Sequence, residues 1–207
     1  APEFQTPTLE SLRQALEKGQ VSLARSAGIA TFPARFQLVL AANPCPCGHA
    51  MTVNRNCTCS AHSKNRYLNR LSGPLLDRID IRLKVRPVNA AQVEISRQNS
   101  NRVSSSQAKA RVISARSQLM ERLSPLGYQL VTHVPPNQLR SVIRPSKSAT
   151  RSIDGALARG GLSMRGYDRC IRIGLTVAAL DGRDEIQASD LDQAFLLRGS
   201  DEVMVAA

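Results

Sequence analysis

The stretch FQLVLAANPCPCG, residues 36–48, decides how the first half of this chain is interpreted. Its first seven residues, 36–42, are almost continuously apolar, which is typical of a strand buried on both faces in the middle of a parallel sheet. Asn43 and Pro44 end the run, because an Asn-Pro pair favours a turn and proline cannot donate to a sheet ladder. The sequence therefore predicts an α/β fold built around a strand at 36–42.

Helix signals lie on both sides of this run. Thr6 followed by Pro7 is a good helix start and Gly19 is a good stop, which predicts a helix over 7–18. Farther along, Ser60 can cap a second helix, which we expect to end by a glycine at position 73. Both helices would cover the faces of the predicted sheet.

Alternating apolar residues predict further extended segments. Residues 20–25 and 29–35 form a hairpin candidate with a turn at Ala27-Gly28. Residues 79–85 alternate between apolar and charged side chains, which predicts a half-buried strand. The first half of the chain thus contains enough predicted strand for a sheet.

The second half of the chain is predicted to be wholly helical. We expect an α/β domain over 1–88 with an inserted cysteine loop at 44–60, a linker over 89–104, and a helical domain over 105–207. The linker assignment rests on a stretch rich in Asn, Gln and Ser without a sustained apolar period. The predicted helices of the last domain are 105–123, 136–143, 149–158, 163–181 and 188–197, with Ser189 as the cap of the last one.

Charge is the strongest compositional feature. The 207 residues carry 28 Lys and Arg against 16 Asp and Glu, a net charge of +12, and 23 of the cations are Arg. Arginine presents a planar fork that matches phosphate oxygens, so nucleotides or nucleic acids are the expected partners. A genome that favours Arg codons is the alternative explanation. Aromatic residues make up only 3%, which argues against base stacking on single strands.

Membrane insertion and export are not expected. No apolar run exceeds five residues, far below the roughly 20 needed to cross a bilayer, and the chain does not begin with a signal-like segment. Few cysteines outside one cluster also point to a reducing compartment. The sequence therefore predicts a cytoplasmic protein without a membrane partner.

Four of the five cysteines, Cys45, Cys47, Cys57 and Cys59, lie within fifteen positions. Four thiolates this close in sequence can close a tetrahedral Zn²⁺ site and order a loop with little apolar content. The Cys-x-Cys spacing is tighter than the usual Cys-x₂₋₄-Cys, and two histidines, at positions 49 and 62, are alternative ligands. Reduced thiols without metal, or disulfides, are the competing interpretation, and Cys170 is expected to be a small core residue.

Several motifs in order along the chain resemble one family. They are FQLVLAANPCPCG (36–48), CTC (57–59), YLNRLSGPLLDRID (67–80) and LSMRGYDRCIR (162–172). Together they are similar to the YifB/ComM family of magnesium-chelatase-like AAA+ ATPases. The resemblance implies the C-terminal part of an AAA+ α/β core followed by a helical lid domain, with ATP and Mg²⁺ as the cofactors of the full-length protein.

The resemblance implies roles for four polar residues. Asn43 corresponds to the sensor-1 residue near the γ-phosphate, although an Asn in this position also caps a strand end. Arg78 corresponds to the arginine finger that reaches into a neighbouring subunit, with a salt bridge to a flanking aspartate as the alternative. Arg165 corresponds to the sensor-2 arginine of the lid, and Arg169, one helical turn on, is the second choice. Either arginine would otherwise be a solvated charge on a helix.

The same resemblance implies which ATPase parts the chain lacks. Pro2-Glu3-Phe4 is similar to the residues that follow the Walker B strand, and no Gly-x-x-x-x-Gly-Lys-Ser/Thr loop occurs in the sequence. We therefore interpret the chain as a C-terminal fragment, which we expect to be inactive by itself.

The implied function is a ring-forming motor, and the ring expected for the full-length protein is a hexamer. In the ComM branch it would remodel DNA as a branch-migration helicase during transformation and recombination, and the positive charge fits that partner. Two alternatives stay open. One is a magnesium-chelatase ATPase subunit that drives metal insertion, and the other is a zinc-dependent nucleic-acid-binding module without ATPase activity.

Overall fold

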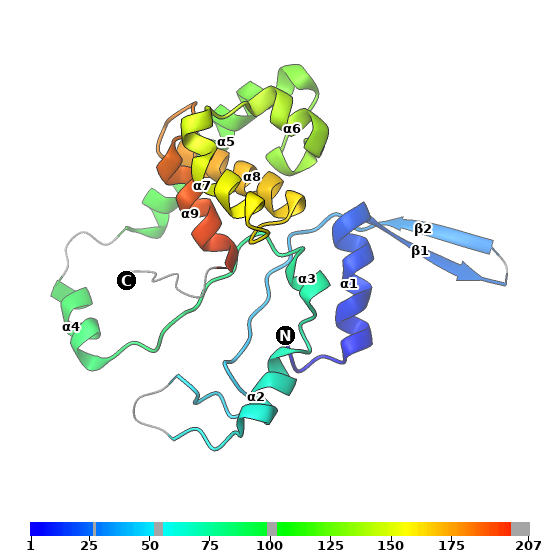
Figure 1. Ribbon diagram of the computed structural model, residues 1–207, viewed down its shortest axis with the longest axis vertical. Coiled ribbons are helices and arrows are strands. Elements are labelled where there is room, and N and C mark those ends of the chain that lie inside the picture. Colours follow the sequence, from blue (N-terminus) through cyan, green and yellow to red (C-terminus); the bar gives the residue numbers. More distant parts are fainter. Residues whose placement is uncertain (27, 52–55, 99–102, 200–207) are drawn as a thin grey trace. The chain divides into compact units, whose positions relative to one another are not determined.

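A computed structural model describes residues 1–26, 28–51, 56–98 and 103–199. The chain divides into two compact units, Ala1–Ile79 and Asp80–Ala207. Most of the described residues are helical, and among them lies one small antiparallel sheet of two strands (Figure 1). The architecture is therefore mixed helical with a single hairpin.

The first unit begins with helix α1 (Thr6–Lys18), which confirms the helix predicted at 7–18. Pro7 lies in its first turn, and Gly19 ends it in the left-handed conformation with φ of 64°. A hairpin of β1 (Gln20–Arg25) and β2 (Gly28–Pro33) follows, so the predicted hairpin is also confirmed. Residue 27, part of the predicted turn, lies outside the described residues.

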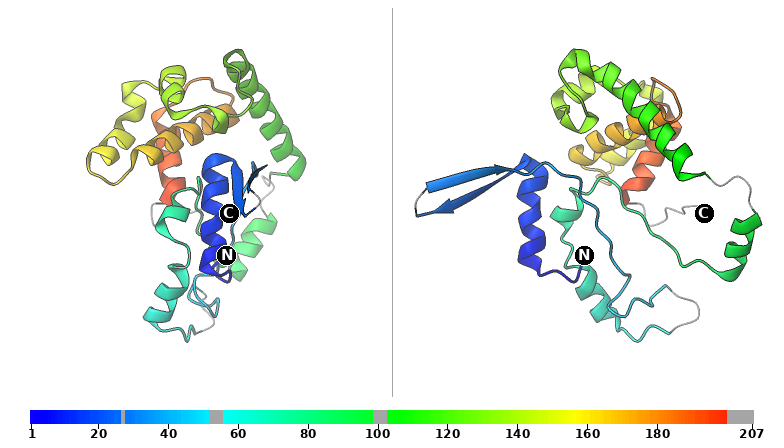
Figure 2. Two further views of the ribbon diagram at one scale, coloured as in Figure 1. Left: turned by 90° about the vertical axis from the view of Figure 1, so that its right-hand side faces the viewer. Right: turned by 180° about the vertical axis from the view of Figure 1, so that it is seen from behind.

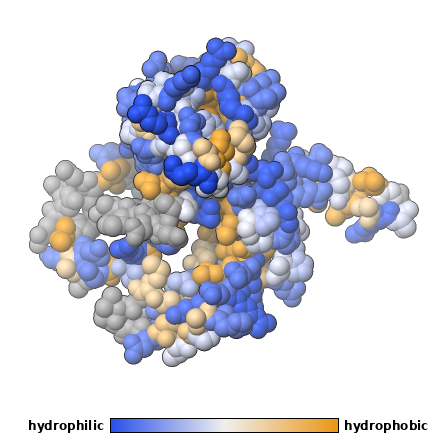
Figure 3. All heavy atoms as spheres, viewed as in Figure 1, coloured by the Kyte–Doolittle hydropathy of each residue, from blue (hydrophilic) through white to orange (hydrophobic). Residues whose placement is uncertain are grey.

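The register of the hairpin pairs its first residue, Gln20, with Pro33, and Arg25 with Gly28. The ribbon extends away from α1 in Figure 1 and in the right view of Figure 2. Apolar side chains on it remain exposed, among them Ile29 and Phe32, and Figure 3 shows hydrophobic residues toward its tip. The hairpin therefore contributes little to the core of its own unit.

Helix α1 packs against the short helix α3 (Gly73–Leu76), and a second short helix, α2 (Ala61–Leu68), precedes α3 in the chain. Leu9 of α1, Tyr67 of α2 and Leu75 of α3 are buried. Polar contacts add to this packing, since Ser72 donates a hydrogen bond to the Glu10 carboxylate. Unit one is thus a small helical core that carries a hairpin and a cysteine loop.

Two predicted strands are wrong for the described structure. Residues 36–42 and 79–85 carry no strand, and apolar side chains that we expected inside a sheet are exposed, with Val39 at 82% and Val85 at 81%. A central strand requires a hydrogen-bonded neighbour on each edge. Among the described residues, the only strand ladder joins β1 to β2, so these apolar segments have no sheet to enter.

The segment predicted as a linker contains a helix, α4 (Ala90–Gln98). Its apolar residues Val93 and Ile95 are exposed. The helix therefore buries little apolar surface, and its sequence shows no sustained apolar period that would have predicted it. The predicted domain limits stay predictions.

The second unit is helical, and all five predicted helices are confirmed. They are α5 (Ser105–Leu123), α6 (Pro136–Ile143), α7 (Lys147–Ala158), α8 (Met164–Leu180) and α9 (Ala188–Gly199), with two short 3₁₀ turns, Ser124–Leu126 and Val131–His133. Helix α8 lies at the centre and packs against α5, α6, α7 and α9 (Figures 1 and 2). Fully buried residues of this core include Leu123, Ile153, Ile171, Leu175 and Leu191. Cys170 is fully buried as predicted, and burial raises its thiol pKa to about 11.

Local caps explain why these helices begin where they do. Ser104 and Gln107 form a complete capping box at the start of α5. At α9 the predicted cap is wrong, because the carboxylate of Asp190, and not Ser189, accepts a hydrogen bond from the Gln187 backbone N–H at 2.8 Å. Asp190 lies at the third helical position, where a side chain can reach back to the residue before the helix.

Among the described residues, no helix is both long enough and apolar enough to span a membrane.

Candidate functional site

The four clustered cysteines meet at one point of the first unit. Cys45 and Cys47 precede the gap at 52–55, and Cys57 and Cys59 follow it. The four Sγ atoms all lie within 4.8 Å of one another, and the cysteines are free thiols. Cys45 is fully buried and the other three are half-buried. The predicted cluster is therefore a compact set of four sulfur donors.

The sulfur spacing fits a tetrahedral metal. The Sγ of Cys45 lies 3.3 Å from that of Cys47 and 3.7 Å from that of Cys57, and the Cys47 and Cys57 sulfurs are 3.6 Å apart. With Zn–S bonds of about 2.3 Å, the edge of a regular tetrahedron is about 3.8 Å. Four soft thiolates at such distances suit Zn²⁺, and neither flanking histidine belongs to the described donor group.

Local hydrogen bonds distribute the protons unevenly over this cluster. The backbone N–H of His49, with help from neighbouring thiols, lowers the pKa of Cys47 to about 6. The backbone of Cys47 favours the Cys59 thiolate, but the neighbouring thiol of Cys47 and burial outweigh it and raise the Cys59 pKa to about 11. One thiol thus ionises readily while another keeps its proton, and a bound metal would have to displace the proton of the second.

The backbone around the cluster is held by turns and a helix cap. Gly48 adopts a left-handed φ of 78°, and its N–H donates to the Cys45 carbonyl at 3.0 Å. Directly after Cys59, Ser60 caps α2 by accepting a hydrogen bond from the Ser63 backbone N–H. The start of α2 is therefore fixed to the last cysteine of the cluster.

Asn43 and Arg78, the predicted sensor-1 and finger residues, both lie in the first unit. Asn43 is exposed and lies close to Gly48 at the entrance of the cysteine loop, not at the end of a strand. Arg78 follows α3, and its side chain is only 10% exposed. Its guanidinium pairs with the Glu17 carboxylate and donates to the Pro74 carbonyl at 2.7 Å.

Glu17 is a site residue that sequence analysis missed. It lies on α1, far from Arg78 in sequence, whereas the alternative considered for Arg78 was an ion pair with a flanking aspartate. No local pattern could have indicated the pair, because the contact depends on how α1 and α3 pack. The finger candidate is thus neutralised within its own unit by a carboxylate.

Arg165 and Arg169 lie on α8 in the second unit. Arg165 is in the first turn and is exposed, whereas the Arg169 side chain is 14% exposed and its Nε lies 3.3 Å from the Asp80 Oδ1. Ser163 caps this helix by accepting from the Gly166 N–H at 3.1 Å. Of the two candidates, Arg165 is the more accessible to a ligand.

Comparison with known proteins places these features in a family. The model described as "Magnesium chelatase, subunit ChlI" matches residues 1–93, and the model "Magnesium chelatase, subunit ChlI C-terminal" matches residues 102–198. The chain is 43% identical over 192 residues to an uncharacterized protein of Mycobacterium tuberculosis, which covers 90% of this chain and 37% of that protein.

Two further relatives carry names. The chain is 35% identical over 204 residues to YifB of Escherichia coli, covering 99% of this chain and 39% of the relative. It is also 35% identical over 193 residues to the competence protein ComM of Haemophilus influenzae, covering 93% and 36%. The chain therefore spans less than two fifths of the length of these relatives. Since two models of one family match it in order from residue 1 to 198, the chain belongs to the magnesium-chelatase-like family that includes YifB and ComM.

Proposed function

We propose that this chain is the sensor, arginine-finger and lid portion of a ring-forming AAA+ ATPase that remodels DNA during transformation and recombination. The observation that carries the proposal is the similarity to a competence protein over 93% of the chain. The net charge of +12 supports a polyanion as the partner. In this proposal the ring is a hexamer, as the family resemblance suggests.

Each candidate residue has a distinct task in this proposal. Asn43 orients the attacking water, Arg78 stabilises charge on the phosphoryl group bound by a neighbouring subunit, and Arg165 couples the lid to the nucleotide, with Arg169 as the second choice. ATP and Mg²⁺ supply the phosphoryl group and neutralise its charge when bound. The 207 residues contain no phosphate-binding loop, so this chain would meet ATP only through these polar side chains.

The ion pair of Arg78 with Glu17 is compatible with a finger. A carboxylate and a phosphate oxygen fit the same guanidinium fork, so Arg78 can exchange one anion for the other. Glu17 is 47% exposed and would remain solvated after the exchange. The pair thus keeps the guanidinium oriented until a nucleotide arrives.

The test is ATP turnover, with and without branched DNA, by a form of the protein that carries this chain together with the phosphate loop. A finger predicts that Arg78→Ala lowers turnover by about 10³-fold or more and that Arg78→Lys does not restore it, because lysine lacks the fork. Glu17→Gln should retain turnover. If the Arg78–Glu17 pair is merely structural, Arg78→Ala and Glu17→Gln should lower stability alike and leave turnover intact.

The matched control is Arg116→Ala, which removes an exposed arginine from α5. DNA-stimulated turnover that Arg78→Ala abolishes and Arg116→Ala retains would support the motor and the finger together. Turnover that ignores DNA would remove the DNA role.

The cysteine geometry favours a second candidate, a zinc-dependent nucleic-acid-binding module. Zinc bound by these four cysteines, whose sulfurs lie at metal-binding distances, would stabilise such a module without any ATPase part. It predicts salt-sensitive DNA binding with Arg78 and Arg165 acting only as charges.

The family description also keeps a chelatase-type ATPase subunit as an alternative. Turnover that responds to a porphyrin-carrying protein instead of DNA would support that alternative.

A further inference from the structure

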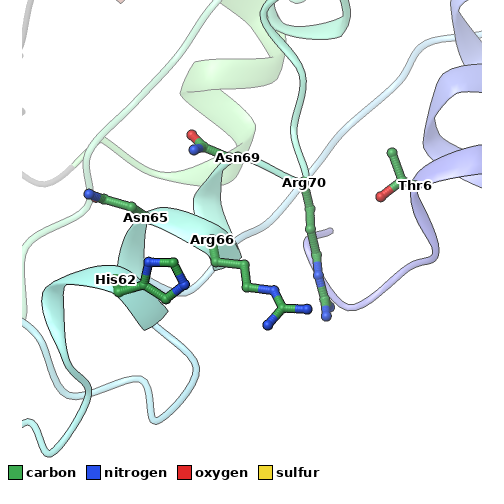
Figure 4. Close-up of a pocket in the computed structure, with 6 residues that line it drawn as sticks. All are labelled: Thr6, His62, Asn65, Arg66, Asn69 and Arg70. Carbon is green, nitrogen blue, oxygen red and sulfur yellow. The ribbon is translucent and has the colours of Figure 1, made fainter.

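One surface of the first unit gathers polar donors around an open hollow of about 610 Å³. It is formed mainly by α2 and the two residues that follow that helix, with one contribution from the start of α1 (Figure 4). The lining residues, which we name the α2 stripe, are Thr6, His62, Asn65, Arg66, Asn69 and Arg70. Their positions on α2 repeat at helical spacing, so one face of the helix presents them together.

The chemistry of the α2 stripe is uniform. Every lining side chain can donate a hydrogen bond, two carry full positive charge, and none is acidic or apolar. Hydroxyl, amide and guanidinium donors are the groups that contact phosphate oxygens in protein–DNA complexes. The only ring among the lining side chains is the imidazole of His62, and one small ring is no platform for stacking successive bases. The stripe therefore suits a phosphate backbone better than an isolated nucleoside.

The two arginines leave positive charge unneutralised at this surface. Figure 4 shows the side chains of Arg66 and Arg70 extending in the same direction from the end of α2. Arg70 donates to the carbonyl of Pro2 at 2.8 Å, which fixes its position without cancelling its charge. Within the described part of the chain, the Arg66 side chain makes no hydrogen bond or ion pair. Like charges one helical turn apart repel each other, and a bound anion would relieve this repulsion.

The stripe is held rigidly from three directions. Ser60, which follows the last cysteine of the cluster, caps α2 at one end, and the Arg70 contact to Pro2 secures the other end. Tyr67, also on α2, is buried. A metal in the cysteine cluster would therefore also fix the start of the stripe.

We propose that the α2 stripe is a binding site for the phosphate backbone of DNA, with Arg66 and Arg70 each neutralising one phosphate. This inference rests on the proposed function, because it names the surface through which the protein meets its DNA. The site reads no sequence, since its donors reach phosphates and not base edges.

The test uses the zinc-loaded full chain and fluorescence anisotropy of a fluorescein-labelled single strand over a series of salt concentrations. Each phosphate contact on a single strand contributes about 0.7 to the slope of log affinity against log salt. Arg66→Ala with Arg70→Ala should therefore lower that slope by about 1.4, which corresponds to about 25-fold weaker binding at 0.1 M salt. Arg66→Ala alone should lower the slope by half as much as the double variant.

The matched control is Arg116→Ala with Arg151→Ala, which removes the same charge from exposed positions of α5 and α7. Circular dichroism on each variant verifies folding, and Arg66→Ala, which breaks no described contact, keeps the test valid if the Arg70 variant unfolds. Binding that weakens equally in the stripe and control variants would overturn the inference while leaving DNA as a partner.

Two further results would also overturn it. If the parent chain binds no DNA at any salt concentration, the inference fails together with the DNA role in the proposed function. If ATP competes with DNA for the parent chain and binds Arg66→Ala more weakly, the stripe is a nucleotide site instead. Only loss of slope confined to the stripe variants supports a DNA backbone site.

Discussion

Gly174→Ala tests the closest approach in the core of the second unit. Gly174 lies in the middle of α8, and a Cβ placed there would be 2.7 Å from Cδ2 of Leu191 and 3.5 Å from Cγ2 of Ile186. Leu191 is fully buried on α9, so it cannot turn into solvent to make room. We expect overpacking to cost about 1–3 kcal/mol of unfolding free energy.

The matched variant is Gly155→Ala, in the neighbouring helix α7. Its added Cβ would lie 3.1 Å from Nη1 of Arg159, the far end of an exposed and flexible side chain that can move away. Both substitutions gain about 1 kcal/mol of helix propensity. This gain cancels when the two variants are compared, so their difference measures the steric cost at Gly174 alone.

The assay is urea unfolding of both variants and the parent, followed by far-ultraviolet circular dichroism. Gly155→Ala should be as stable as the parent or more stable, and Gly174→Ala should be less stable than Gly155→Ala by about 1–3 kcal/mol. Leu191→Val shortens the opposing side chain, so it should lower the free energy of unfolding less in the Gly174→Ala background than in the parent. Equal stability of the two alanine variants would refute the close packing of α8 on α9.

Three further expectations concern the metal cluster and two titrating groups. The full chain should bind one zinc ion by elemental analysis, and Cys45→Ser, which removes the fully buried donor, should abolish it. A hydrogen bond from Arg183 is the main cause of a lowered Asp190 pKa. Ionised Asp190 therefore stabilises the folded state at pH values above the ordinary aspartate pKa of 3.8, and this stabilisation is lost as the pH falls below it. Asp190→Asn should reduce the dependence of the unfolding free energy on pH in this acid range. Burial and Asp154 raise the Tyr167 pKa to about 12, so stability should decline as pH rises from about 10 to 12, and Tyr167→Phe should remove that decline in pH-dependent unfolding.

Helices were predictable because their signals are local. Pro7 and Gly19 set the limits of α1, and the proline at position 136 marks the start of α6. Each of these signals acts within a few residues of the helix end it marks. The start of α9 needed more, because the Asp190 carboxylate that caps it also accepts a hydrogen bond from Arg183, which lies before the helix.

Strands depend on distant partners, and here local reasoning failed. The apolar run at 36–42 has the composition of a central strand, but strand formation also requires neighbours that donate and accept hydrogen bonds. The hairpin succeeded because its partner strands, β1 and β2, are adjacent in sequence. The exposed Val39 and Val85 mark the places where the sequence pattern expects a sheet that the described residues do not form.

The site was predictable in its ligands but not in its ion pairs. Four cysteines at short spacing specify a cluster whatever the surrounding fold, so Cys45 and Cys57 meet as predicted. Arg78 was identified by its motif, but its partner Glu17 lies on α1, far away in sequence. Because of this pair, Arg78 has to leave the Glu17 carboxylate before it can contact a phosphate. A motif thus identifies a side chain, whereas packing determines its resting partner.

The cysteine cluster and the α2 stripe depend on each other physically. The loop around the cluster contains few apolar residues, so metal bonds would supply the ordering that a hydrophobic core supplies elsewhere. Because Ser60 joins Cys59 to the first turn of α2, loss of order in the loop would release the helix cap and the donors aligned behind it. DNA affinity through the stripe should therefore fall when zinc is removed, even though no stripe residue is a described member of the cysteine donor group.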